Sequence, residues 1–407
     1  MFSSKVSTSL YVLVSLLLST IVVEAGYSGC ETVGTRKEIR QMRAEERDAF
    51  VDAVNKFKST RLYDNLVVTH SGYYQFGHNS SAFLPWNRYY LRQFEQNLQL
   101  INPLVTLPYW DWSLDSQAPE RSTIFKWFGS NGGSYKNYCL RNGAFSGWKV
   151  QNPKPTCLRR AFDGGDKLSA FPPPEVISYI LKASNDFKEF TRFIEQGIHG
   201  QVLQTINGDL GTIFGPNDPL YWLIHSFIDK IWADWQSGSV HRLLNYNGIN
   251  NQGGNVAHCD LIVPWAVPVS AVLDTLSPGL CYSYSPSVSS KLMLPDQQVW
   301  RNDHFYQSPN PLDRQDGYHL RKPRNLSKQW IDQYALNNGQ VQKTENILHS
   351  VIDNLNSMDY QSLVALDKRA LLEDSLDTEY PSEVGYADLR LPDSSSLNNF
   401  CPVIARS

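Results

Sequence analysis

The sequence predicts a mostly helical fold around a large core that is rich in aromatic residues. Apolar side chains recur at helical spacing in several long stretches, and Pro residues stand where two of these stretches are expected to begin. Phe, Trp and Tyr make up 12% of the residues, with 11 Trp among them, which predicts a bulky interior. A chain of 407 residues is long enough for two or three domains, or for one large domain with extensions.

Five stretches carry the helical pattern, namely 35–58, 83–100, 174–206, 217–236 and 340–373. In the third stretch, Pro174 and Glu175 suit the first turn of a helix. In the fourth, Asp218 stands directly before Pro219, the arrangement expected of a capping residue followed by Pro at the first helical position. Residues 120–172 are rich in Gly, Asn and Pro, and they predict a long loop region between the second and third helices.

The composition changes beyond about residue 285. Ser, Asn, Asp and Gln become common and apolar runs become short, so residues 286–407 are expected to form a C-terminal extension of unknown role. This extension contains the dibasic pair Lys368-Arg369. Such a pair suits a proteolytic processing site, although most dibasic pairs are only solvated charges.

The charge balance excludes two classes of protein. The formal net charge is −3 and charged residues make up 19%, so the chain lacks the basic surface that binds nucleic acid. Hydrophobic residues reach 42%, which is too many for a disordered acidic chain.

The first 25 residues have the pattern of a secretory signal. Lys5 gives a positive start, residues 10–23 form an apolar run, and small residues follow as a cleavage site. The alternative is a membrane anchor, but about 14 apolar residues are too few for a bilayer core that needs roughly 20. We therefore expect a secreted protein that does not span a membrane. Two N-x-S/T sequons, at Asn79 and Asn325, are typical of an exported glycoprotein.

Six cysteines lie outside the signal segment: Cys30, Cys139, Cys157, Cys259, Cys281 and Cys401. An even number in an exported chain predicts three disulfides, although the sequence leaves their pairing open. Pairing of sequence neighbours would join Cys139 to Cys157 and Cys259 to Cys281, which leaves Cys30 for Cys401. No C-x-x-C pair is present, and this argues against a zinc or redox motif.

Four of the nine histidines fall in or beside the aromatic-rich helical stretches: His70, His78, His199 and His225. Histidine is the commonest metal ligand, and several histidines on facing helices can build a buried site. Taken singly, each is more often a hydrogen-bonded core residue than a ligand. The other five fit surface or loop positions, and they are His241, His258, His304, His319 and His349.

The residues around the first two histidines resemble the first copper motif of the tyrosinase family of type 3 copper proteins, which includes catechol oxidases and hemocyanins. In that family two spaced histidines are followed by a third within an F-L-P-W-H-R-Y-Y-L helix. Here His70 and His78 are followed by F-L-P-W-N-R-Y-Y-L at 83–91 and by the equally typical L-P-Y-W-D-W at 107–112.

The second copper motif of the family also has a counterpart. The family pattern is H-N-x-V-H, then G-D-M, then N-D-P-x-F-W-L-H-H-x-x-x-D. This chain has H-G-Q-V-L from His199, G-D-L from Gly208, and N-D-P-L-Y-W-L-I-H at 217–225, ending at Asp229. The resemblance covers roughly residues 30–285, with several long motifs in the family's order.

The resemblance implies a tyrosinase-like copper-binding domain over residues 26–285. Its fold would be a four-helix bundle with long disulfide-tied loops, holding two copper ions with three histidines each. The implied activity is the oxidation of small phenols by molecular oxygen. No nucleic-acid or membrane partner is implied.

The ligand set departs from the family at both copper positions. Asn87 stands where the first motif has its third histidine, and Leu203 stands where the second motif has its second histidine. Gly200 replaces an Asn of the motif, and Ile224 replaces the first histidine of a pair whose ligand is His225. The side chain of Asn87 offers an oxygen, which suits Cu(I) less well than an imidazole does, and Leu203 offers no donor. We therefore expect a weakened dicopper site.

Glu195 is the candidate for an acid–base role. The family's monophenol chemistry uses a Glu-held water near the Asn of the second motif, and Glu195 lies four residues before His199. With Gly200 in place of that Asn, the water would have one anchor fewer. Oxidation of diphenols is therefore expected in preference to hydroxylation of monophenols.

Two hypotheses follow from this incomplete set. In the first, the chain is a secreted copper oxidase of diphenols that uses the four histidines together with Asn87. In the second, it is a degenerate homologue that keeps the fold as a secreted structural or binding module. A glycan on Asn79, directly after His78, would favour the second hypothesis because it would crowd the metal pocket.

Overall fold

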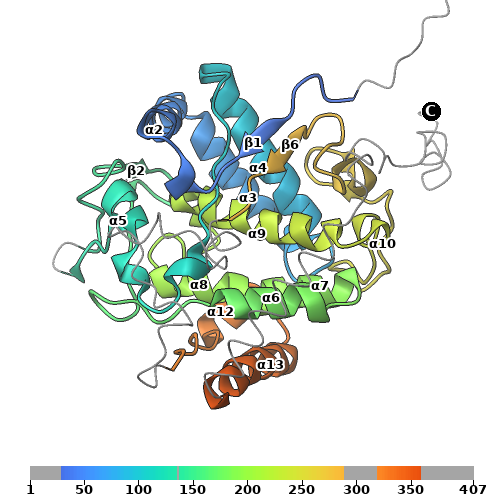
Figure 1. Ribbon diagram of the computed structural model, residues 1–407. Helices are drawn as coiled ribbons and strands as arrows, with labels where there is room; N and C mark the ends of the chain where they lie inside the picture. Colours follow the sequence, from blue (N-terminus) through green and yellow to red (C-terminus); the bar gives the residue numbers. More distant parts are fainter. Residues whose placement is uncertain (1–28, 135–136, 288–318, 359–407) are drawn as a thin grey trace, which may run out of the picture.

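The computed structural model describes residues 29–134, 137–287 and 319–358 (Figure 1). The expected signal segment, the dibasic pair at 368–369, His304 and Cys401 lie outside these residues. Within them the protein is mostly helical, as predicted. The α-helices are α2 (Ala44–Ser59), α3 (Leu62–Gly77), α4 (Phe83–Ile101), α5 (Thr123–Phe128), α6 (Pro174–Ala183), α7 (Phe187–Phe193), α8 (Gly200–Ile206), α9 (Leu220–Ser237), α10 (Val240–Leu243), α12 (Lys328–Gln333) and α13 (Asn338–Ser357).

Shorter elements connect these helices. A π-helical turn, η5 (Ile194–His199), joins α7 to α8. The strands form two-residue or three-residue pairs: β1 (Gly34–Arg36) with β6 (Tyr282–Tyr284), β2 (Lys149–Val150) with β3 (Thr156–Cys157), and β4 (Leu261–Ile262) with β5 (Val267–Pro268). The 3-10 turns are η1 (Ile39–Gln41), η2 (Trp112–Asp115), η3 (Pro119–Arg121), η6 (Gly215–Asn217) and η7 (Val269–Val272).

Helix α4 contacts α2, α3 and α9 (Figure 1). Its apolar face is rich in aromatic side chains, and Phe94 stacks on Trp222 of α9 with ring centroids 3.9 Å apart. Trp222 also meets Tyr63 of α3, edge to face at 6.1 Å. Such contacts stabilise a core beyond the burial of their area, and here they fix the three helices against one another.

The helix boundaries agree with the sequence where the apolar pattern is strong. The stretches predicted at 83–100 and 217–236 correspond to α4 and α9. Helix α9 begins later than predicted because Gly215–Asn217 forms a 3-10 turn, after which a side-chain oxygen of Asp218 accepts from the amide of Leu220 at 2.9 Å. The stretch predicted to be helical at 174–206 is helical over most of its length. A break near Ser184 and a π-helical turn divide it into α6, α7 and α8.

A cluster of buried charges ties strand β1 to helices α4 and α9. Arg36 donates to Glu95 at 2.8 Å and to Asp229 at 3.3 Å, and Arg88 donates to the other oxygen of Asp229 at 2.6 Å. Burial alone would raise the pKa values of both carboxyl groups, but the adjacent guanidinium groups hold them below their ordinary values. Both carboxyl groups are therefore ionised, and the partly buried Arg92, 3.0 Å from Glu95, adds a third cation to Arg36 and Arg88.

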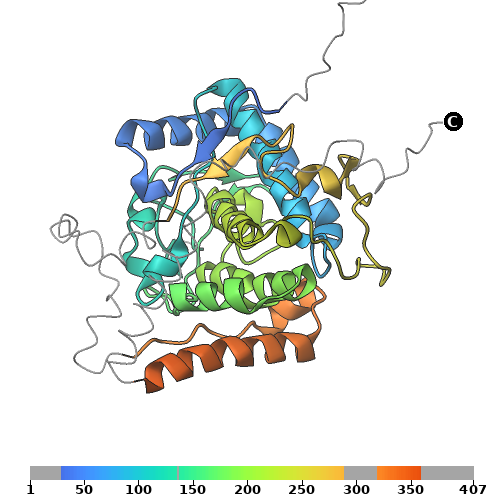
Figure 2. The same ribbon diagram turned by 45° about the vertical axis from the view of Figure 1, so that its right-hand side comes forward.

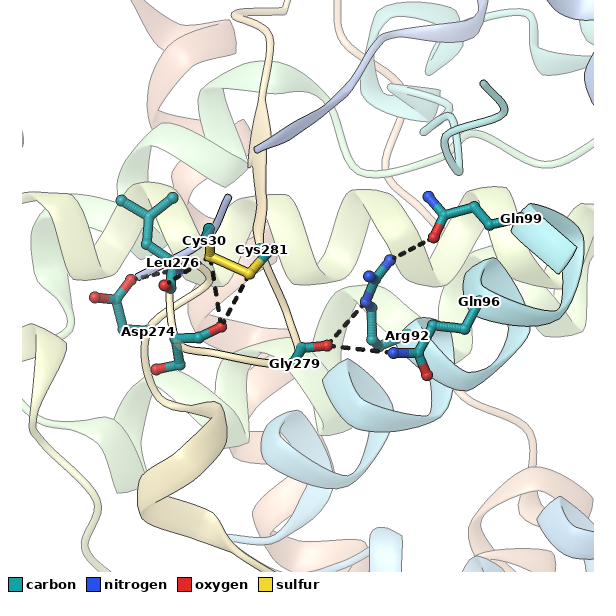
Figure 3. Close-up of a disulfide and its surroundings, with 9 residues drawn as sticks. Cys30, Arg92, Gln96, Gln99, Asp274, Leu276, Gly279 and Cys281 are labelled. Carbon is teal, nitrogen blue, oxygen red and sulfur yellow. Dashed lines mark hydrogen bonds between the residues drawn. A yellow bond between two sulfur atoms is a disulfide. The ribbon is translucent and has the colours of Figure 1, made fainter. Parts of the chain in front are cut away.

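The disulfides agree with the sequence expectation in part. The bond between Cys139 and Cys157 is present, as predicted. The expected Cys259–Cys281 and Cys30–Cys401 pairings were wrong, because Cys30 bonds to Cys281 instead (Figure 3). The parallel pairing of β1 with β6 brings these two residues together, with Cα atoms 5.4 Å apart. Cys259 is also disulfide-bonded.

The described part of the C-terminal extension packs on the bundle. Helix α13 lies beside α6 and contacts the π-helical turn η5 (Figure 2). The short helix α12 precedes it and buries Trp330 and Ile331. None of the described helices is long and apolar enough to cross a membrane.

Breaking the buried charge cluster should destabilise the fold strongly. We predict that Asp229→Asn lowers the free energy of unfolding by about 3–5 kcal/mol, because it leaves Arg88 buried without its anionic partner and leaves Arg36 with Glu95 alone. The matched control is Asp332→Asn, whose partner Lys328 is exposed, and it should cost at most about 1 kcal/mol. Chemical denaturation of both variants measures the difference, and equal effects would contradict the role of the cluster.

Candidate metal centre

Four imidazoles meet inside the bundle, from three parts of the chain. His70 lies within α3, His78 ends that helix, His199 ends the π-helical turn, and His225 lies in α9. All four are at most 3% exposed. Neighbouring ring centroids are 5.7 Å apart for His70 and His78, 5.9 Å for His78 and His199, and 4.8 Å for His199 and His225.

Oxygen atoms around the cluster fix how three of the rings are turned. The Nδ1 atom of His70 lies 2.7 Å from the carbonyl oxygen of Ile213, and that of His225 lies 3.0 Å from the carbonyl oxygen of Tyr221. Because a carbonyl only accepts, both Nδ1 atoms carry the proton and both Nε2 atoms keep a lone pair. Ligating histidines in metalloproteins are held in the same way.

Glu195 holds the third ring. One of its oxygens accepts from the amide of Asn79 at 2.6 Å and lies 3.1 Å from Nδ1 of His78. Burial raises the pKa of this carboxyl to about 8. The structure therefore places the predicted acid–base residue on the outer edge of His78, where it orients the imidazole.

The Nε2 atoms face the interior without outside partners. Those of His70 and His78 are buried and have no hydrogen-bond partner, whereas those of His199 and His225 lie 3.0 Å from each other. Burial lowers the pKa values of all four, to about 3 for His70 and His78, so the rings are neutral near pH 7. Neutral imidazoles with bare nitrogens are the form in which histidine binds a metal.

The two residues that replace histidines are buried beside this cluster. Asn87 of α4 donates through Nδ2 to the carbonyl of Phe83 at 2.8 Å, and its Oδ1 accepts from the hydroxyl of Tyr221 at 3.3 Å. Leu203 of α8 is 2% exposed and belongs to the apolar core. Position 87 therefore keeps one oxygen donor, and position 203 keeps none.

Gly200 is a glycine because a side chain from the C-terminal extension occupies its space. A Cβ atom on Gly200 would lie 2.6 Å from Nε1 of Trp330 and 2.8 Å from a methyl carbon of Leu326. The Trp330 ring is also 6.0 Å from His199. The indole of Trp330 therefore occupies the space that the Asn side chain of the family's motif would need.

The same segment covers His78. The ring of Tyr334 lies 4.8 Å from the His78 ring, centroid to centroid, and Asn79 donates through its side chain to the carbonyl of Ala335 at 2.9 Å. Residues 326–335, here called the covering segment, therefore pack directly against two of the four imidazoles. Nothing in the sequence of this segment predicted that position, because it carries no recognisable motif.

The remaining histidines lie away from the cluster where the structure describes them. His258 binds the carbonyl of Leu244 and His349 binds the carbonyl of Pro323. Sequence reasoning did not select Tyr221, whose ring stacks on His225 with centroids 3.7 Å apart. The signal that could have identified Tyr221 was the motif itself, because the family has Phe at this position.

The residues present fit copper as donors but do not complete two three-imidazole sites. The bare Nε2 atoms of His70 and His78, on rings that oxygen atoms hold at Nδ1, suit the metal. However, among the described residues no three His, Cys, Asp or Glu side chains are grouped so that they could hold a metal ion together. The site therefore keeps two of the three expected imidazoles of each ligand set, and oxygen atoms hold three of these four rings at Nδ1.

Comparisons with known proteins agree with the motifs. Residues 60–238 match the family model described as the common central domain of tyrosinase. The chain is 31% identical over 301 residues to tyrosinase ustQ of Aspergillus flavus, which covers 66% of this chain and 84% of that protein. It is 34% identical over 227 residues to a tyrosinase of Streptomyces antibioticus, covering 49% and 82%. A polyphenol oxidase structure from Thermothelomyces thermophila superposes with a TM-score of 0.51 at 22% identity, covering 62% and 89%.

The contact between Gly200 and Trp330 leads to a stability prediction. Gly200→Ala should lower the free energy of unfolding by about 1–3 kcal/mol and loosen the covering segment, because the added methyl overlaps the indole. The control is Gly72→Ala in α3, where no atom lies within 4 Å of the new methyl and the change should stabilise by about 0.5–1 kcal/mol. Denaturation and hydrogen exchange of residues 326–335 measure both effects.

The neutral imidazoles also predict an acid sensitivity of the metal-free protein. The pKa values of His70 and His78 are about 3 in the folded chain and 6.5 in the unfolded chain. Below pH 6.5 the unfolded chain therefore binds protons that the folded chain does not, so stability falls as the pH falls, by up to about 1.4 kcal/mol per pH unit for each ring. Urea unfolding at about pH 7 and about pH 5 tests this. His78→Gln should flatten the dependence, and an unchanged slope would contradict it.

Proposed function

Because this chain belongs to the tyrosinase family of type 3 copper proteins, we propose that it is an exported copper-binding relative of the phenol oxidases with a weakened metal site. The observation that carries the proposal is the set of four buried neutral imidazoles. Three of them are held at Nδ1 by oxygen atoms, which leaves Nε2 for a metal. An unpaired buried nitrogen costs about 1–3 kcal/mol, and a bound metal ion would remove that cost.

His70 and His78 would hold copper at the first position, and His199 and His225 would hold it at the second. Loss of a supporting partner alone costs about 10–100-fold in metal affinity, and the loss of an imidazole ligand at each position costs at least as much. Copper affinity is therefore lower than that of a complete site. When bound, copper would supply electron transfer from a small phenolic substrate to molecular oxygen.

The proposed substrates are diphenols in preference to monophenols. Hydroxylation of a monophenol would need a base that holds a water, yet Glu195 is engaged with Asn79 and His78. The position of the motif's Asn is Gly200, and Trp330 fills the space beside it. Neither contact favours a positioned water at this point.

Export of the protein is part of the proposal. The secretory pattern of the first 25 residues supports it. The disulfides Cys30–Cys281 and Cys139–Cys157 support it as well, because such bonds persist in oxidising compartments. The first of them fixes the loop after Asp274 next to α4, where Arg92 and Gln96 donate to the carbonyl of Gly279 (Figure 3).

A second candidate function is a binding or structural module without oxidase activity. The observation that favours it is the covering segment, because Trp330 and Tyr334 pack against His199 and His78 where a phenol would approach. The apolar replacements Leu203 and Ile224, both buried, point the same way. The two candidates differ in whether purified protein consumes oxygen.

Restoring the ligands separates these candidates. We predict that Asn87→His with Leu203→His raises bound copper toward two ions per chain, with oxygen uptake on a catechol. Tyr221→Phe is added because the Tyr221 hydroxyl, 3.3 Å from Asn87, leaves too little room for an imidazole. Metal analysis after dialysis and an oxygen electrode give the readouts.

The control is Asn97→His, ten residues further along α4 and only half-buried, which should change neither readout. If the restored variant folds but binds no more copper than the parent chain, the pocket itself has lost its metal-binding shape. That result would favour the binding or structural module.

A further inference from the structure

Two residues that depart from the family's motifs, Asn87 and Tyr221, contact each other. The family has His and Phe where this chain has Asn87 and Tyr221. The Tyr221 hydroxyl donates to Oδ1 of Asn87 at 3.3 Å, and both residues are at most 3% exposed. The pair therefore brings two oxygen atoms into a buried place where the family has none.

Tyr221 lies between the two halves of the imidazole cluster. Its ring stacks on His225 with centroids 3.7 Å apart, and it meets His70 edge to face with centroids 5.4 Å apart. The Nε2 atom of His70 is buried and has no partner, and the same holds for His78. Tyr221 of α9 thus packs against His70, whose bare Nε2 atom belongs to the same cluster as that of His78.

The hydroxyl of Tyr221 is weakly held. A separation of 3.3 Å is long for an O–H···O hydrogen bond, which usually spans about 2.5–3.0 Å. Tyr90, whose ring also lies beside His70, differs because its hydroxyl donates at 2.8 Å to the carbonyl of Leu66. Of these two neighbours of His70, Tyr221 has the longer and weaker hydrogen bond, so its hydroxyl loses less when that bond is replaced.

Asn87 is fixed so that its oxygen faces this hydroxyl. Its Nδ2 donates to the carbonyl of Phe83 at 2.8 Å, which settles the orientation of the carboxamide. The Oδ1 atom then has Tyr221 as a weak donor and a lone pair to spare. Asn87 therefore both orients the phenol and adds a second oxygen beside it.

We propose that Tyr221 is a metal ligand, and that the first metal position is a mixed site of the His70 and His78 nitrogens with the phenol oxygen of Tyr221, oriented by Asn87. This inference rests on the proposed function, since it assumes that copper binds at all. Oxygen donors are hard ligands, and a nitrogen–oxygen set selects Cu(II) over Cu(I). On binding, the Cu–O bond replaces the O–H bond of Tyr221 and the proton leaves to solvent; no electron is transferred.

The test is Cu(II) binding to the full chain, followed by visible absorption and electron paramagnetic resonance. We expect an isolated, paramagnetic Cu(II) signal with a phenolate-to-copper absorption band. Tyr221→Phe, which introduces the family's own residue and so keeps the fold, should abolish the band and weaken Cu(II) binding about tenfold or more. The affinity for Cu(I) should stay unchanged. A general packing defect would instead weaken the binding of Cu(I) and Cu(II) alike.

Tyr90→Phe is the matched control, because Tyr90 is buried beside His70 but its hydroxyl is bound to Leu66. It should keep both the band and the affinity. If copper binds but Tyr221→Phe leaves the band and the Cu(II) affinity as they were, the ligand assignment is wrong while the proposed function stands. If no variant and no parent chain binds copper, the proposed function fails and this inference fails with it.

Discussion

The buried ion cluster of Arg36, Arg88, Glu95 and Asp229 sets the positions on which the imidazoles depend. Asp229 lies one helical turn after His225 on α9, and Arg88 directly follows Asn87 on α4. The 2.6 Å contact between Asp229 and Arg88 therefore locks the two helices at the level of the metal centre. An ion pair removed from water tolerates little displacement, because a shifted partner leaves a buried charge without compensation.

The candidate metal centre departs from the family's motifs in its ligands but keeps contacts that orient its imidazoles. One ligand position has changed in each half, yet oxygen atoms of Ile213, Glu195 and Tyr221 hold three of the four remaining rings. These outer contacts have a structural use of their own, since a buried N–H needs an acceptor whether or not a metal is bound. The oxygen atoms that accept from these rings are therefore needed for packing as well as for metal binding.

The sequence predicted local features well and distant contacts poorly. Helices α4 and α9 could be predicted because their apolar pattern is strong and a cap or Pro marks the start. The gathering of the four histidines followed from motif order. The Cys30–Cys281 bond could not be predicted, because it depends on pairing between β1 and β6 across 251 residues. The packing of Trp330 against Gly200 could not be predicted either, because neither residue carries a periodic or motif signal for the other.

The contact at Gly200 also has an evolutionary consequence. Any side chain regained at this position meets the Trp330 indole, so the family's Asn cannot return by one substitution at an acceptable cost in stability. A lineage would have to remove the indole first, which would uncover His199 before the new Asn had any use. Positions 200 and 330 are therefore coupled: a side chain at position 200 requires a smaller residue at position 330.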